Sequence, residues 1–187
     1  MATSNTYAFN PSLGELVLYA YGLAQVRNTA LAQEHMEAAR MASNMLLARW
    51  SNQGVNLWAV DLQTVPLVLG QSTYNVPLNT VTMLDTYIVI DNGNGAPIDR
   101  IILPISRTEY ASYPNKQQQG FPTTFWFDRL ISGSRSTGSV GPNVNLWPVP
   151  DGTQTSLKYY SVLRLQDANM NGTDNVDIPP IWLEAMI

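Results

Sequence analysis

Apolar residues recur every three or four positions in the first part of the chain, and this spacing predicts two helices. The first is expected near residues 12–22, where Ser12 and Glu15 have the spacing of a capping box. The second is expected near 29–53, in a stretch rich in Ala, Met, Leu, Glu and Gln, which favour helices. Gly54 can adopt the left-handed conformation that ends a helix, so the helical region is expected to stop there.

After Gly54 the apolar spacing changes to every second residue, which indicates strands. Gly70-Gln71 falls between two alternating runs, at the place where a hairpin turn would lie. Ser106 and Glu109 form a second capping-box pattern, which predicts a short helix near 107–113 inside the strand region. A long half-buried strand is expected where Leu157, Tyr159, Ser161, Leu163 and Leu165 alternate with mostly polar residues.

The pattern as a whole predicts an α+β protein, with an N-terminal helical bundle and a mostly antiparallel β-domain. Near the end of the chain, Pro180 suits the first position of a helix starting at about 180. Only about two turns follow it, so this helix must pack on the helical region or on a partner. The expected organisation is a mobile arm at 1–11, a helical region at 12–54, a β-rich domain at 55–167, and a loop with the C-terminal helix at 168–187.

The amino-acid composition favours some classes of protein and excludes others. Hydrophobic residues make up 45% of the 187 residues, but charged residues only 13%, about half the usual share. So little charge favours a protein whose faces are covered in an assembly. The net charge of −4 and the lack of a Lys/Arg run argue against a protein that grips DNA. With no cysteine, thiolate zinc sites are excluded, and neither a secretory signal nor a membrane span is expected.

No catalytic constellation is evident. The only histidine, His35, lies in the middle of the second predicted helix, where a structural role at the core edge or beside a Glu is expected. A glycosidase needs two carboxylates around a cleft. The strand region holds acids that could supply them, although each lies where a turn or cap favours an acid; these are Asp85, Asp91, Asp99, Glu109 and Asp128.

The stretch from Asp167 to Gly172 reads D-x-N-x-N-G, the opening of a calcium-binding loop. Its candidate metal ligands are Asp167, Asn169 and Asn171. The twelfth position, which should be a bidentate Glu, is Ile178, and a strand rather than a helix precedes the loop. We therefore favour a polar turn, whose Asn and Asp side chains bond to nearby backbone, over a metal site.

Large aromatic residues lie at the junctions between predicted elements, a position typical of subunit seams. Together with the apolar end of the chain they give the candidate partner-interface residues: Trp182, Leu183, Met186, Ile187, Trp50 and Trp58. Exposed aromatics such as Trp126 leave open a carbohydrate-binding β module.

An ordered set of motifs resembles one protein family. Met45 to Trp58 reads MLLARWSNQGVNLW, a helix end followed by a turn and a strand. Further matches follow at Leu69–Pro77, Pro104–Tyr110, Leu146–Pro150 and Ile178–Ala185. Over residues 12–187 the chain resembles the head-to-tail adaptors of short-tailed bacteriophages, also called tail tubular protein A-like proteins or tail accessory factors. No single motif is specific to this family, but the order in which the motifs occur is.

The resemblance implies a ring of identical copies, a dodecamer, between the portal protein and the tail nozzle, a tail tubular protein B-like protein. A tail fibre is a further candidate partner, and double-stranded DNA would pass through the lumen without specific binding. It also implies a structural virion protein of the tail or connector, assembled in the host cytoplasm and acting in genome ejection without cofactor or catalysis. A cell-wall hydrolase and a carbohydrate-binding tail component remain the alternatives.

Overall fold

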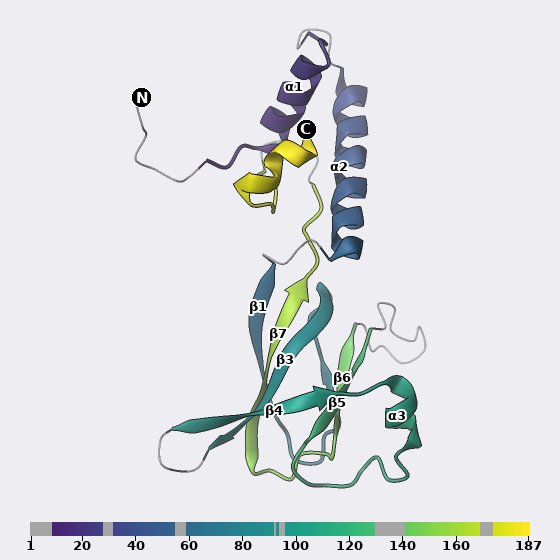
Figure 1. Cartoon of the computed structure of the whole chain (residues 1–187), viewed down its shortest axis with the longest axis vertical. Coiled ribbons are helices and arrows are strands. Elements are labelled where there is room, and N and C mark those ends of the chain that lie inside the picture. Colours follow the sequence, from purple (N-terminus) through teal and green to yellow (C-terminus); the bar gives the residue numbers. More distant parts are fainter. Residues whose placement is uncertain are drawn as a thin grey trace. The chain divides into compact units, whose positions relative to one another are not determined.

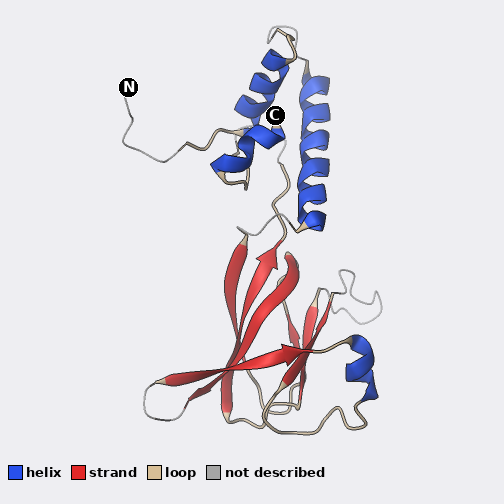
Figure 2. Ribbon diagram, viewed as in Figure 1, coloured by secondary structure: helices blue, strands red, loops and turns tan. Residues whose placement is uncertain are grey.

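A computed structural model describes residues 9–27, 32–54, 59–91, 93, 96–129, 141–168 and 174–187. The chain divides into two compact units (Figure 1). The helical unit combines Met1–Trp58 with Leu165–Ile187, and the β unit is Ala59–Arg164. Figure 2 shows that helices dominate the first unit and strands the second. The predicted α+β class is confirmed.

The helical unit contains α1 (Leu13–Leu23), α2 (Gln33–Gln53) and a C-terminal 3₁₀ helix, η2 (Pro180–Met186). The predicted capping box of α1 is present: the Ser12 hydroxyl accepts from the Glu15 backbone at 3.3 Å, and a Glu15 carboxylate oxygen accepts from the Ser12 backbone at 2.9 Å. Gly54 ends α2 in the left-handed conformation, with φ of 69°. These local signals define the start of α1 and the end of α2 through short-range interactions alone.

Two helix predictions need correction. The second helix begins at Gln33 rather than near residue 29, and residues 28–31 lie outside the described part. Here His35 supplies the cap, because its ring Nδ1 accepts from the Ala32 backbone at 3.1 Å. The helix expected from about 180 is a 3₁₀ helix, the tighter form that suits short pieces. The predicted N-terminal helical bundle is therefore not confirmed in the form expected.

The β unit is a curled seven-stranded sheet in the order β1-β7-β3-β4-β5-β6-β2. Its strands are β1 (Val60–Pro66), β2 (Thr73–Asn75), β3 (Thr80–Asp91), β4 (Pro97–Pro104), β5 (Thr124–Asp128), β6 (Asn143–Trp147) and β7 (Gln154–Leu163). All paired neighbours are antiparallel except β4 and β5. The short helix α3 (Arg107–Ser112) lies in the β4–β5 connection, since parallel strands need a crossover.

The core of the β unit lies on the inner face of the curled sheet. Leu157, Tyr159 and Ser161 of β7 are fully buried, as the alternation of that strand predicts. Leu157 and Tyr159 belong to a core cluster that also includes Tyr74, Val76, Ile88, Ile102, Phe125, Val144 and Leu146. Burial raises the pKa of the Tyr159 hydroxyl to about 12.

The expected hairpin around Gly70-Gln71 does not form. β1 pairs with β7 and β2 with β6, so these two consecutive strands lie at opposite ends of the strand order. Their connection is nevertheless held in place: the Tyr74 hydroxyl donates to the Val68 carbonyl at 3.2 Å and accepts from the Val68 amide at 3.0 Å. The turn residues were recognised correctly, but the strand partners were not.

Candidate partner interface

Helix α1 is apolar on all sides. Its sequence, LGELVLYAYGL, carries a single charge, Glu15. Leu13, Leu16 and Val17 are buried, as expected for the side that packs in the unit. Tyr19 and Leu23 point away and are 58% and 62% exposed. A helix that is hydrophobic all round is normally buried all round, so the outward face of α1 is suited to a partner.

Helix α2 has a second exposed apolar pair. Met41 and Met45 are one turn apart and are 57% and 68% exposed. The α2 residues that line the cavity next to α1 are Ala39, Ala42, Ser43 and Leu46. At 100° per residue, the two methionines lie on the other side of the helix. Unbranched methionines adapt readily to a binding partner.

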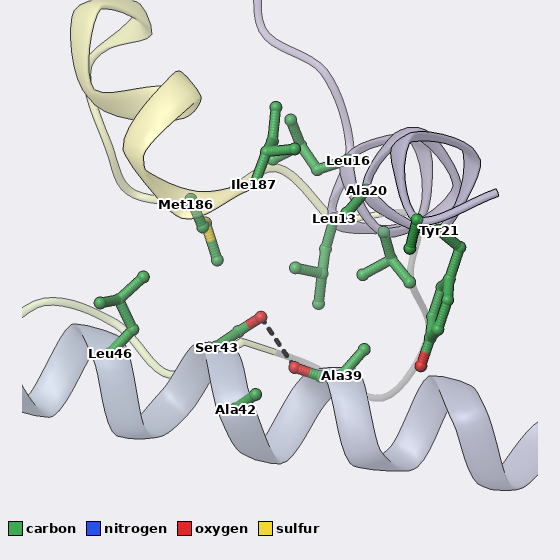
Figure 3. A pocket seen from close by; sticks show the side chains of 12 residues that line it. Leu13, Leu16, Ala20, Tyr21, Ala39, Ala42, Ser43, Leu46, Met186 and Ile187 are labelled. Carbon is green, nitrogen blue, oxygen red and sulfur yellow. Dashed lines mark hydrogen bonds between the residues drawn. The ribbon is translucent and has the colours of Figure 1, made fainter. Parts of the chain in front are cut away.

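A cavity of about 450 Å³ lies inside the helical unit, between α1, α2 and the end of η2 (Figure 3). Figure 3 shows side chains such as Leu13, Ala20 and Leu46 around it, with Met186 and Ile187 reaching in from the C-terminal segment. The lining is mostly aliphatic and includes no charged side chain. Its hydroxyl groups belong to Tyr21 and Ser43, which donate to backbone carbonyls, so the space offers little to orient a polar ligand.

The predicted interface residues have different surroundings. Trp50 and Leu183 are buried within the helical unit, and the Trp50 ring lies 6.2 Å from that of Trp182. Trp182 and Ile187 are partly exposed, and Met186 lines the cavity. Trp58 lies outside the described residues. These contacts hold η2 on its own unit.

The predicted set omits several exposed apolar residues. Next to Trp182, Ile181 is 84% exposed. The outward residues of α1 and α2 were also missed, namely Leu18, Tyr19, Leu23, Met41 and Met45. For α1 the signal was available, because eleven residues carry only one charge. For α2 the buried and outward faces could be assigned only once the position of α1 was known.

The β unit also has an exposed apolar face. Leu62 of β1 pairs with Tyr160 of β7, and both side chains are exposed on the outer face of the sheet. On the same face Tyr87 lies between Lys158 and Ile101 in the strand register. Burial raises the pKa of the Tyr87 hydroxyl. The negative charges of nearby ionisable groups raise it further; these groups are Asp85, Tyr160 and Asp99. This face therefore mixes apolar surface with a small group of ionisable residues.

Three of the five candidate catalytic acids have local structural roles. Asp99 forms an ion pair with Lys158 at 3.3 Å. Asp91 accepts a hydrogen bond from the Gly93 backbone at 2.9 Å in a turn. Glu109 occupies the capped first turn of α3, where its backbone N–H donates to the Ser106 hydroxyl. Asp85 is exposed on β3, and Asp128 ends β5.

His35 and Trp126, the candidate base and the candidate carbohydrate-binding residue, also make structural contacts. The His35 carbonyl accepts a hydrogen bond from the Tyr21 hydroxyl at 3.1 Å, and the rings of these residues meet edge to face. The histidine thus joins α1 to α2. The Trp126 ring lies 5.3 Å from that of Tyr110, so α3 covers part of the aromatic surface proposed for carbohydrate.

The loop after β7 is tied to α2. The Ala168 amide donates to the Asn44 side chain at 2.7 Å, and Asp167 lines a cavity of about 430 Å³ with Arg40 and Asp177. Asn169 and Asn171 lie outside the described residues, so the geometry of the D-x-N-x-N-G stretch stays a prediction. Within the described ranges, no three His, Cys, Asp or Glu side chains gather as a metal site would need.

Exposed apolar surface on both units is typical of a protein that assembles with others. The sequence matches the family model of the SU10 adaptor protein over residues 18–187. The chain therefore belongs to the SU10 adaptor family of structural phage proteins, and the predicted membership of the phage head-to-tail adaptors is confirmed. Membership implies a component of the virion that associates with other virion proteins.

Among curated proteins, no match to the chain was found. Of the helices in the described ranges, none combines the length and the apolar character needed to cross a membrane.

Proposed function

We propose that copies of this chain form a ring, a dodecamer, between the portal protein at the capsid vertex and the tail nozzle of a short-tailed phage. The observation that supports this most directly is the family match over residues 18–187. A closed ring needs two different surfaces on each copy, because each copy contacts one neighbour on either side. The exposed apolar faces of α1 and α2 are two such surfaces within one unit.

In this proposal the phage genome passes through the ring during ejection. The chain has a net charge of −4 and no run of Lys or Arg. Because tight DNA binding depends on clustered cations that displace counterions, such a lumen would let double-stranded DNA slide. Assembly would take place in the host cytoplasm, with the nozzle protein and, as a further candidate, a tail fibre added after the ring.

The portal contact is proposed to involve η2 and its surroundings. Trp50 and Leu183 would anchor η2 on α2, so that two helices and the 3₁₀ helix act as one small helical bundle. Trp182 would then be available at the contact, together with the strongly exposed Ile181. Apolar side chains held on a rigid support are typical of interface hot spots.

Electron microscopy of the purified chain mixed with portal rings tests this function. We expect a ring of density bound coaxially to the portal. In a binding assay, Ile181→Glu should weaken the portal contact at least tenfold, because the new charge would be desolvated there. Its matched control is Gln117→Glu, which adds the same charge on an exposed loop of the β unit.

Far-UV circular dichroism of both variants should match that of the wild type, since neither site is buried. A chain that stays monomeric and ignores every portal ring would rule the proposal out. Equal portal binding by both variants would leave the ring in place but would refute the contact through η2.

A further inference from the structure

The two exposed faces of the helical unit lie on opposite sides of the α1–α2 pair. Leu13, Leu16 and Ala20 of α1 point to the cavity that α2 also lines. Tyr19 lies on another side of α1, away from that cavity, as its exposure shows. On α2, Met41 and Met45 are turned away from α1 in the same way. Neither face can therefore be covered by the other within one copy.

The two faces also have matching spacing and charge. On α1, Glu15, Tyr19 and Leu23 follow one another at intervals of four residues, and all three are exposed. On α2, Met41, Met45 and Arg49 follow at the same interval and are exposed as well. Rows of side chains four residues apart form the ridges that interdigitate when two helices pack.

In an antiparallel arrangement the two rows match residue by residue. Glu15 then meets Arg49, Tyr19 meets Met45 and Leu23 meets Met41. The end pair joins a carboxylate to a guanidinium, and the two other pairs are apolar. A parallel arrangement would place Glu15 beside Met41 and Leu23 beside Arg49, which leaves both charges beside apolar side chains. Charge thus favours one orientation, even though an exposed ion pair adds little affinity by itself.

We propose that the outward face of α1 in one copy docks antiparallel on the outward face of α2 in a second copy. This inference rests on the proposed ring, and it names the surface through which neighbouring copies touch. The contact is heterologous, because each copy offers a different face to each neighbour, and such contacts close into rings. It also explains why α1 carries apolar residues such as Tyr19 and Leu23 on a face that is uncovered in one copy.

Cysteine cross-linking tests the contact directly, because the chain has no cysteine of its own. The variant carries Tyr19→Cys and Met45→Cys, two exposed positions where substitution leaves the fold intact. The purified chain is treated with a short bis-maleimide reagent and run on a denaturing gel. We expect a ladder of covalent multimers that extends well beyond the dimer. Each single-cysteine variant should stay monomeric, because neither face meets itself.

The control pair is Tyr19→Cys with Thr64→Cys, which places the second thiol on the exposed edge strand β1. It reports chance collisions and should give at least tenfold less cross-linked product. Dimers from Tyr19→Cys alone would show that α1 packs on α1, which overturns the inference.

The same samples are viewed by electron microscopy to separate the two proposals. Rings without a Tyr19→Cys, Met45→Cys ladder would overturn this contact and leave the ring standing. If neither rings nor a ladder form, with or without portal rings, both the proposed ring and the proposed contact are refuted.

Discussion

Two buried tyrosines of the β unit differ in what surrounds their hydroxyls. The Tyr74 hydroxyl bonds to both the amide and the carbonyl of Val68. The Tyr159 hydroxyl is buried and has no hydrogen-bond partner among the described residues. A buried polar group without a partner costs free energy, whereas a satisfied one contributes modestly to stability.

We expect Tyr159→Phe to leave the free energy of unfolding unchanged or to raise it by about 1 kcal/mol, since it removes an unsatisfied hydroxyl. Tyr74→Phe is the matched control and should lower it by about 1–2 kcal/mol, because the Val68 groups lose their partner. Urea unfolding followed by tryptophan fluorescence measures both. If Tyr159→Phe lowered the free energy of unfolding more than Tyr74→Phe does, the Tyr159 hydroxyl would not be an unsatisfied group.

Alkaline pH gives a second measurement of the same side chain. Burial raises the pKa of Tyr159 from 10.0 to about 12, so the folded state holds this proton longer than the unfolded state does. The stabilisation of the folded state that depends on the protonated Tyr159 hydroxyl is therefore fully present below pH 10. It is lost as the pH rises to about 12. Tyr159→Phe should lose less stability over that range, and an identical loss would show that this tyrosine is not the group responsible.

Residue types alone were a good guide to the role of His35 but not to its partners. Its place among helix formers indicated a structural residue, and it does join α1 to α2. Of the two expected positions, the core edge fits its intermediate burial, and its ring nitrogen accepts from the Ala32 backbone rather than pairing with a Glu. The prediction that Trp50 and Trp182 lie at a subunit seam stays a prediction, and the fold shows that their rings meet within the helical unit.

At the scale of elements, the ends of helices could be predicted well where a local bond decides them. Ser12 with Glu15, Ser106 before α3, and Gly54 after α2 all act within a few residues of themselves. The alternation along β7 also predicted its buried side. Such signals need no information about the rest of the chain.

Strand partners could not be predicted in the same way. The turn at Gly70-Gln71 suggested a hairpin, yet β1 and β2 pair with strands from the end of the β unit. Alternation states which residues face the core, but it carries no information about the neighbouring strand. The parallel β4–β5 pair was missed for the same reason.

The capping box of α1 can be tested by substitution. Ser12→Ala removes the acceptor for the Glu15 amide, and the helical unit should lose about 1 kcal/mol of stability. Ser43→Ala is the matched control, because the Ser43 hydroxyl only donates to the Ala39 carbonyl one turn earlier in α2. It should change stability by less than about 0.5 kcal/mol, since alanine is the better helix former.

Thermal unfolding followed by circular dichroism at the helix wavelength compares the two variants. Equal effects of Ser12→Ala and Ser43→Ala would show that the cap does not contribute to the stability of α1.

At the scale of the molecule, the low share of charged residues predicted covered surfaces before any surface could be located. The structure places exposed apolar residues on both units. Family membership narrows the partners to those of a phage virion. The proposal that the outward faces of α1 and α2 meet between neighbouring copies then rests on the spacing and charge of their exposed side chains. These could be compared only after the fold had shown which residues face outward.

The division into two units makes a prediction about how the chain folds. Every residue of the β-unit core cluster lies between Tyr74 and Tyr159, so residues 59–164 contain a complete core. The helical unit is assembled from both ends of the chain, since Val176, Ile178 and Leu183 are buried in it together with α1 and α2. A domain with its own core can fold alone, but one that lacks part of its core cannot hold its remaining helices.

We therefore expect a fragment of residues 59–164 to fold cooperatively, whereas removal of 165–187 from the full chain should unfold α1 and α2 and spare the sheet. Fluorescence distinguishes the units, because Trp126 and Trp147 lie in the β unit and Trp50 in the helical unit. The fragment should keep the blue-shifted emission and the urea midpoint of its two tryptophans. The truncated chain should lose most helical signal, because it keeps only part of the apolar surface that buries α1. A fragment without cooperative unfolding, or a truncated chain with full helicity, would mean that the two units depend on each other for their stability.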